Sequence, residues 1–171
     1  ALFATTVIAA PPGATPLSPP VPPKSVAPHV PANWKVGVAV AKVTPQKMLF
    51  MAGYASRNKP AEGKVQDLFA KALALQDEQG NKLVFVTLDL IGVPHLLRHA
   101  VAERAEKEFD LPQASLVMNA SHTHSGPDTY AFPDEEGKHY ADPKYLDWVC
   151  DQAAEAANEA IGVSVAPGSE T

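Results

Sequence analysis

The sequence predicts an α/β fold, a mixed sheet that contains a parallel β-α-β unit and has helices packed on it. Two apolar runs, 82–90 and 114–121, have the composition of buried strands, and the segment between them, 93–112, has helical spacing. A second segment of helical spacing lies near the end of the sequence. With 46% hydrophobic and 19% charged residues, the chain can build a sizeable core.

A Pro-rich arm precedes the predicted domain. Residues 11–33 hold nine of the 17 prolines, and proline fixes φ and lacks an N–H, so we interpret residues 1–33 as an extended arm or linker. The first ten residues, ALFATTVIAA, suit the remnant of a secretory signal or the start of a mature chain. We therefore expect a secreted or periplasmic protein whose α/β domain occupies residues 34–171.

The first two elements of the domain differ in clarity. In 35–45, β-branched residues alternate until Pro45, which predicts a strand. The next segment, 66–80, has an apolar stripe at helical spacing, but its alternation of Leu and Ala is also typical of a strand. The stripe comprises Leu68, Phe69, Ala72 and Leu75. We expect a short helix there and keep the strand as the alternative.

The β-α-β unit follows. The run 82–90, KLVFVTLDL, is apolar almost throughout, so we expect a central strand that is covered on both faces. Pro94 suits the first turn of the next helix, and Pro112 ends that segment. The run 114–121 is the second strand, and a strand, helix and strand with short joints predict a parallel pair.

The last predicted element is a helix. Asp142 and Pro143 are typical of a helix start, and Gly162 is typical of a helix end. Its predicted buried side comprises Leu146, Val149, Ala153, Ala156, Ala157 and Ala160. Cys150 is the sole cysteine, so no intrachain disulfide can form, and we expect it to be a packing residue.

Charge and hydropathy argue against a nucleic-acid partner and against a membrane-spanning helix. The net charge is −5 and no dense block of Lys and Arg occurs, so we expect no nucleic-acid partner. No apolar run approaches the roughly 20 residues that a membrane-spanning helix needs, so we expect no transmembrane segment.

Two histidines follow the second strand of the β-α-β unit, in the stretch SLVMNASHTHSGPDTY. Ligands of α/β sheets bind outside the carboxyl ends of the strands, and Asp89, His122 and His124 all lie at such ends. Residues i and i+2 of an extended chain point the same way, so both imidazoles can converge on one object. Neutral imidazole is a good Zn²⁺ ligand, which makes the pair a candidate zinc site.

The neighbours of the histidines are candidates for a supporting role. Ser121, Thr123 and Ser125 can hold the imidazole rings or order the loop. Gly126 and Pro127 predict a tight turn whose backbone N–H groups can face an oxyanion.

Each of these features also has a plainer interpretation. A His-x-His pair also occurs without a metal, and Asp89 suits a helix cap or a hydrogen bond within a loop. His95 and His99 lie four apart on a predicted helix with no carboxylate partner in view, so we expect a solvated face. The acidic stretch 134–140, DEEGKHY, is expected to be a surface loop.

The stretch SHTHSGPDTY resembles the THTHSGP signature of the neutral/alkaline, non-lysosomal ceramidases. Four other segments agree in order and spacing. VGVAVAKVTP resembles the opening strand of the family, MAGYA its Gly-Tyr turn, and DLFAKALALQDEQGNKLVFVTLDLIGV the following block. YLDWVCDQAAEAANEAI resembles the helix after the signature. The resemblance runs from about Val36 to Ile161.

The resemblance implies zinc-dependent amide hydrolysis. It maps His122 onto a zinc ligand and His124 onto a catalytic histidine near the reacting amide, with a zinc-activated water as nucleophile. The substrate would be a ceramide-like lipid, cleaved to sphingosine and a fatty acid. Asp89, Ser121, Ser125 and Gly126 would then support the substrate or the ligands.

The resemblance is also incomplete. The family's other metal ligands, a second His, a Glu and a Tyr, lie downstream of any residue in this sequence, so a downstream segment or another chain would supply them. Three alternatives stay open: a relative that has lost catalysis, a non-catalytic scaffold or interaction subunit that uses the Pro-rich arm, and a metal hydrolase of another substrate.

Overall fold

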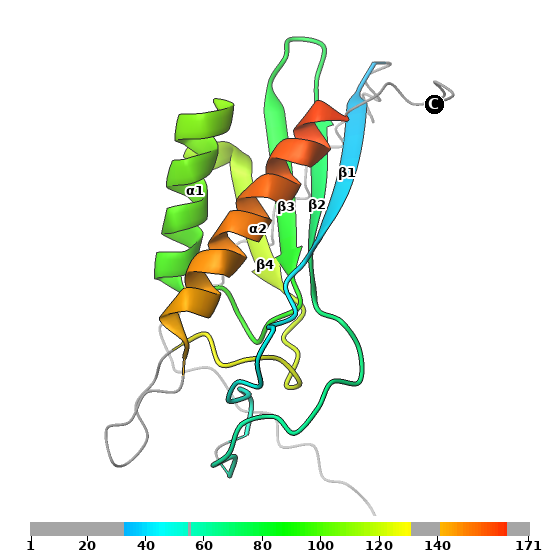
Figure 1. The fold of residues 1–171 in the computed structure, drawn as a ribbon. Coiled ribbons are helices and arrows are strands. Elements are labelled where there is room, and N and C mark those ends of the chain that lie inside the picture. The colour runs from blue at the N-terminus through cyan, green and yellow to red at the C-terminus, as the bar shows by residue number, and fades with distance from the viewer. Residues whose placement is uncertain (1–32, 55, 131–140, 164–171) are drawn as a thin grey trace, which may run out of the picture. The chain divides into compact units, whose positions relative to one another are not determined.

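The computed structural model describes residues 33–54, 56–130 and 141–163 (Figure 1). Residues 1–32 of the predicted Pro-rich arm and the acidic stretch 134–140 lie outside the described residues. The strands are β1 (Lys35–Lys42), β2 (Phe69–Gln76), β3 (Lys82–Leu88) and β4 (Leu116–Ala120), and the helices are α1 (His95–Phe109), the short 3₁₀ helix η1 (Gln113–Ser115) and α2 (Pro143–Gly162).

The four strands form one mixed sheet in the order β1-β2-β3-β4. β1, β2 and β3 pair antiparallel, whereas β3 and β4 pair parallel and are joined through α1. The predicted α/β fold with its parallel β-α-β unit is therefore confirmed.

The helix expected between residues 66 and 80 is wrong, because this segment is strand β2. Its alanines, Ala70, Ala72 and Ala74, are buried at period two, and β2 pairs with a strand on each side. Two ladders of backbone hydrogen bonds and this alternation outweigh the helical preference of Ala, Leu and Lys.

Both helices cover the same face of the sheet (Figure 1). That face carries small or branched apolar side chains, and one row of paired residues runs across it: Ala39, Ala72, Val86 and Met118. α2 packs mainly on β1 and β2, where the small side chains admit a helix closely, and α1 packs against α2.

The opposite face of the sheet carries a row of apolar side chains that no described residue covers. The neighbouring row of paired residues comprises Val38, Leu73, Phe85 and Val117, and Val38 is 66% exposed. The expectation that β3 is covered on both faces is therefore wrong for the described part of the chain. We name this surface the open face and define it by that row.

Helix α2 begins as predicted. The Asp142 carboxylate accepts a hydrogen bond from the backbone N–H of Tyr145 at 3.1 Å, and Pro143 occupies the first turn. Tyr145 is buried where Leu146 was expected, because its hydroxyl donates to the Val43 carbonyl at 2.8 Å. Burial and the nearby carboxylates of Asp147 and Asp151 raise the pKa of the Cys150 thiol to about 11, as suits a packing residue.

The loops that follow β1, β3 and β4 gather at one end of the sheet (Figure 1). This end holds the two histidines of interest. Among the described helices, none combines the length and apolar character needed to cross a membrane.

Candidate functional site

The histidine loop, residues 121–128, leaves the end of β4 and stays beside the end of β3. The N–H of Ser121 donates to the Leu88 carbonyl at 2.9 Å, and the N–H of Thr123 donates to the Leu90 carbonyl at 3.2 Å. Between these bonds His122 adopts a left-handed conformation with φ of 59°. Such a conformation costs a non-glycine residue about 1 kcal/mol or more and is often found at functional sites.

The ring of His122 is held by the backbone. Its Nδ1 atom lies 2.7 Å from the carbonyl oxygen of Ile91. A carbonyl oxygen can only accept, so Nδ1 carries the proton and Nε2 presents a lone pair. A metal-binding histidine is oriented in the same way by a partner on its second nitrogen.

The two imidazoles converge. The Nε2 atoms of His122 and His124 are 3.4 Å apart, and the rings meet edge to face at a centroid distance of 5.0 Å. Two nitrogens that each lie about 2.05 Å from one tetrahedral Zn²⁺ are about 3.3 Å apart. The pair therefore has the spacing of two ligands of one zinc ion. The convergence arises through the left-handed turn at His122, whereas extended backbone was expected.

The described residues provide only some of the ligands that a zinc ion needs. Nowhere in 33–54, 56–130 or 141–163 do three or more His, Cys, Asp or Glu side chains form a group that could hold a metal. A catalytic zinc takes three protein ligands as a rule. The chemistry of the two imidazoles fits zinc, but further ligands are needed.

Asp89 is directed elsewhere. Its carboxylate accepts from the backbone N–H of Phe69 at 3.1 Å and pairs with Lys71 at 3.3 Å. These contacts tie the end of β3 to β2. These partners are not the histidines, so in the structure Asp89 acts as a hydrogen-bonding residue at the end of β3.

The hydroxyl residues order the loop. The Thr123 hydroxyl accepts from the backbone N–H of Ser125 at 3.1 Å, while Ser121 is exposed beside His122. The imidazole partner that was expected among these hydroxyls is instead the Ile91 carbonyl.

Gly126 and Pro127 are buried and join the histidine loop to a second loop. The Gly126 carbonyl accepts from the N–H of Ala52 at 3.1 Å, and the N–H of Asp128 donates to the Phe50 carbonyl at 2.8 Å. A Cβ atom at Gly126 would lie 3.3 Å from the Asp89 carbonyl oxygen, so the chain passes close to the end of β3.

The second loop contributes residues that the sequence analysis did not select. We name it the Gly-Tyr loop, residues 50–54 and 56–57. Gly53, with φ of 105°, lies against the His124 ring so closely that an added Cβ would be 2.5 Å from His124 Cγ. The Tyr54 ring meets the His124 ring edge on at 5.0 Å. Arg57 stacks over Tyr54, with Cζ 4.7 Å from the ring centroid.

One sequence signal pointed to this loop. The segment MAGYA was part of the family resemblance, and a glycine before an aromatic residue in a loop suggests a left-handed position with a close neighbour. Which neighbour it contacts depends on the pairing of two loops far apart in sequence, which no local pattern shows.

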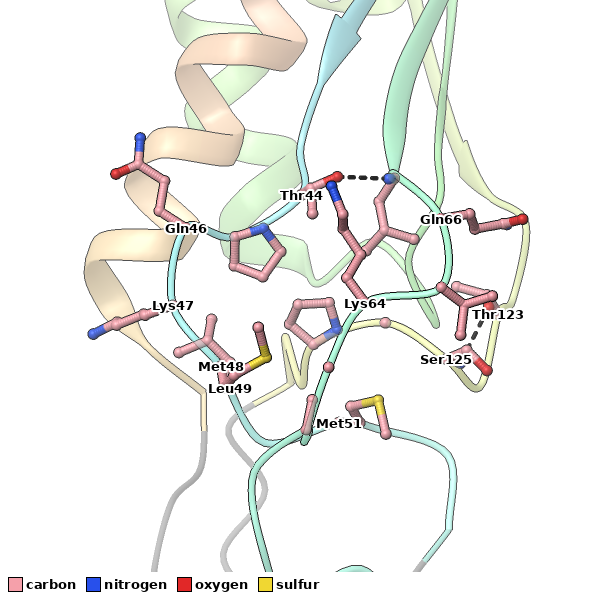
Figure 2. A pocket seen from close by; sticks show the side chains of 17 residues that line it. Thr44, Gln46, Lys47, Met48, Leu49, Met51, Lys64, Gln66, Thr123 and Ser125 are labelled. Atoms are coloured by element: carbon pink, nitrogen blue, oxygen red, sulfur yellow. Dashed lines mark hydrogen bonds between the residues drawn. The ribbon is translucent and has the colours of Figure 1, made fainter.

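A cavity of about 750 Å³ borders the histidine loop (Figure 2). Thr123 and Ser125 lie on one side of it, and Met48 and Leu49 lie on the other. Neither histidine lines this cavity, because Thr123 and Ser125 face it from the histidine loop and the two histidines do not. Its size is in the range of ligand pockets, which are about 300–1,000 Å³ and mostly apolar.

An ionic cluster fixes one edge of the cavity. Asp67 pairs with Lys42 at 2.9 Å and with Lys64 at 2.7 Å, and it accepts from the Thr44 hydroxyl at 2.9 Å. The hydrogen bonds from Lys64, Lys42 and Thr44 lower the pKa of the Asp67 carboxyl well below its ordinary value of 3.8.

The other histidine pair lies apart from this site. His95 and His99 stack on the exposed side of α1 at a centroid distance of 6.1 Å, and His99 Nε2 lies 3.2 Å from a Glu103 carboxylate oxygen. Their exposure agrees with the expected solvated face, whereas the expected lack of a carboxylate partner is wrong, because Glu103 lies one helical turn after His99.

Comparison with known proteins gives consistent results. The family model described as "Neutral/alkaline non-lysosomal ceramidase, N-terminal" matches residues 34–163. The chain is 31% identical over 102 residues to the neutral ceramidase of Drosophila melanogaster, covering 57% of this chain and 14% of that protein. It is 31% identical over 98 residues to neutral ceramidase 2 of Arabidopsis thaliana, covering 56% of this chain and 13% of that protein. The chain thus matches about one seventh of the length of these curated relatives.

The fold matches a solved structure. The crystal structure of neutral ceramidase from Pseudomonas aeruginosa superposes with a TM-score of 0.69 at 21% identity, covering 79% of this chain and 22% of that chain. A structure described as ceramidase complexed with C2 gives the same values. At this identity the likeness establishes the shared fold.

Proposed function

Because the chain belongs to the neutral/alkaline non-lysosomal ceramidase family, we propose that it forms part of a zinc-dependent amidohydrolase that cleaves the N-acyl amide of ceramide-like lipids. The products would be sphingosine and a fatty acid. The observation that carries this proposal is the 3.4 Å separation of the His122 and His124 Nε2 atoms, which suits joint action on one metal-bound reaction centre.

His122 is the proposed zinc ligand. The Ile91 carbonyl fixes its Nδ1–H, so Nε2 stays free for an ion. A bound zinc would supply a Lewis acid and a water of lowered pKa. The remaining ligands would come from polypeptide beyond the described residues, either a downstream segment or another chain.

His124 is the proposed catalytic residue. We assign it no ligand role: its Nε2 lies 3.4 Å from that of His122, so an Nε2–H there can donate to the carbonyl oxygen of an amide held beside an ion on His122. Such a donor stabilises the negative charge that develops on this oxygen when the amide is attacked. Gly53 and Tyr54 restrict the ring, which favours a preorganised donor.

The adjacent cavity supports a lipid as substrate. The side chains of Met48, Leu49, Met51 and Val65 give it an apolar lining, and the histidine loop forms one wall. Methionine side chains adapt to flexible aliphatic groups. We propose that one hydrocarbon chain of the substrate lies there while its amide reaches the histidines.

Metal analysis and turnover test the function together. The intact protein is expected to hold about one zinc per chain. His122→Ala should lose this zinc, whereas His99→Ala, which changes an exposed histidine of α1, should retain it. Release of fatty acid from a short-chain ceramide should exceed release from simple esters and N-acyl amino acids. Full zinc retention in His122→Ala would discard the ligand assignment, and preference for another substrate would point to a different hydrolase.

A scaffold is the second candidate function, and the open face favours it. Val38 is 66% exposed, Leu73 36% and Val117 39% in one row across the sheet, and contiguous apolar surface of this kind often marks a protein interface. Under this alternative the intact protein binds no zinc and turns over no amide, and Val38→Lys abolishes association with a partner.

A further inference from the structure

We infer that Arg57 is a positioning residue that holds His124 in its working orientation. The inference rests on the proposed function for the role of His124, but its structural part stands on contacts alone. Arg57 is a half-buried, permanently charged side chain in the Gly-Tyr loop. It does not line the cavity beside the histidine loop, and it contacts the backbone of His124 as well as the loop that packs against the His124 ring.

The guanidinium joins the two loops through their backbones. Its Nη1 donates to the His124 carbonyl oxygen at 2.5 Å and also to the carbonyl oxygen of Ala52. Hydrogen bonds from a charged donor are about twice as strong as neutral ones. The backbone of His124 is thereby fixed to the loop whose Gly53 and Tyr54 contact its ring.

The same guanidinium also stacks on the Tyr54 ring, which packs against the His124 ring. Its Cζ lies 4.7 Å from the Tyr54 centroid, and Tyr54 in turn meets His124 edge on at 5.0 Å. Tyr54 is 58% exposed, so little else restrains it. The N–H of Arg57 donates to the Tyr54 carbonyl at 3.1 Å, which closes the turn between them.

Only arginine combines these contacts. A planar guanidinium can stack on a ring with its face while its edge donates to carbonyls, whereas an ammonium is a compact point charge. Without Arg57, both the His124 backbone and the Tyr54 ring lose a restraint. The His124 ring would then sample orientations in which Nε2 no longer faces His122.

The first test reads the histidine directly and needs neither metal nor substrate. In the intact protein, ¹H–¹⁵N spectra of the imidazoles should shift or broaden for His124 in Arg57→Ala and in Arg57→Lys, while His99 stays unchanged. Lys59→Ala is the matched control, because it removes a nearby exposed charge that pairs with Glu62. An Arg57→Ala spectrum identical to that of Lys59→Ala would overturn the inference.

The second test separates positioning from general destabilisation. In the active protein, Arg57→Ala should lower kcat about 10- to 100-fold with little change in KM, because misplacement of a catalytic group by about 1 Å has effects of this size. Millimolar guanidinium should restore part of the loss, and Arg57→Lys should not match the wild type. A loss that guanidinium leaves unchanged and that follows a lower melting temperature would show a merely structural residue.

The two proposals fail in different ways. If the wild-type protein binds no zinc and cleaves no amide, the proposed function is wrong, and the imidazole spectra still decide whether Arg57 positions His124. If the wild type is active and Arg57→Ala retains its kcat, the inference about Arg57 is wrong while the function stands.

Discussion

His122 takes its orientation from Ile91, a residue 31 positions earlier in the chain: the Nδ1 of the ring lies 2.7 Å from the Ile91 carbonyl oxygen. The contact crosses from the end of β4 to the segment after β3. It explains how a residue at the rim of the sheet, in a left-handed conformation, keeps one defined nitrogen available.

This contact predicts the tautomer of His122. Above the usual titration range of imidazole, at a pH of about 8.5, His122 should carry its proton on Nδ1. His99 is the matched control, because its Nε2 faces Glu103 at 3.2 Å and should carry the proton there. Two-bond ¹H–¹⁵N correlations distinguish the two tautomers, and a proton on His122 Nε2 would contradict the assigned contact.

Gly53→Ala should destabilise the protein and impair the site. A Cβ there would lie 2.5 Å from His124 Cγ, and a φ of 105° strains any residue with a side chain. We expect a loss of about 1–3 kcal/mol in the free energy of unfolding. Gly63→Ala is the control, since its Cβ would meet nothing within 4 Å, and it should stay within about 0.5 kcal/mol of wild type. Urea unfolding measures both, and equal effects would refute the close approach.

Asp67 should make stability depend on pH in the acidic range. Its folded pKa is lowered by Lys64, Lys42 and Thr44, so its contribution is present above the ordinary value and is lost as the pH falls through the lowered one. Asp67→Asn should therefore be less stable than wild type at neutral pH, and the difference should shrink in strong acid. Glu62→Gln, which removes an exposed pair with Lys59, should show a much smaller difference. A gap between Asp67→Asn and wild type that is constant over pH would argue against the ionic cluster.

Val65 should affect turnover of long-chain substrates only. It lines the cavity and is fully exposed in the structure, so Val65→Ala should leave stability unchanged. It should lower kcat/KM for a long-chain amide by up to about tenfold, which corresponds to the free energy of burying roughly two methyl groups. Leu96→Ala removes an 80% exposed side chain of α1 outside the cavity and should have no such effect. The same loss with a short-chain amide would place the hydrocarbon chain elsewhere.

Cys150 should resist alkylation in the folded protein. Burial and two neighbouring carboxylates raise its pKa to about 11, and only the thiolate reacts. At neutral pH, iodoacetamide should modify it far more slowly than in urea. Equal rates in the two conditions would show that the thiol is accessible and that its packing role is wrong.

Several elements of the fold could be predicted from the sequence because local patterns encode them. The β-α-β unit, the Asp142 cap and the position of the histidines at a strand end all follow from spacing and from residue type. Segment 66–80 was wrongly predicted as a helix, because Ala and Leu occur in both helices and strands. Pairing with the two neighbouring strands makes it a strand. Tyr145 replaced Leu146 in the core through a hydrogen bond to Val43, a residue more than a hundred positions away.

Only part of the candidate site could be predicted from the sequence. His122 and His124 stand out because of their type and spacing. The Ile91 carbonyl has no sequence signal, since any residue can offer one. Gly53 and Arg57 became relevant only when the two loops were found paired.

That pairing of residues 50–52 with 126–128 also sets when the histidines acquire their geometry during folding. Contacts between such distant segments carry a loop-closure cost and tend to form late. Until they form, the His124 ring lacks its contacts with Gly53 and Tyr54. Binding of the proposed zinc ion should therefore be coupled to the completion of the tertiary structure, so that each stabilises the other.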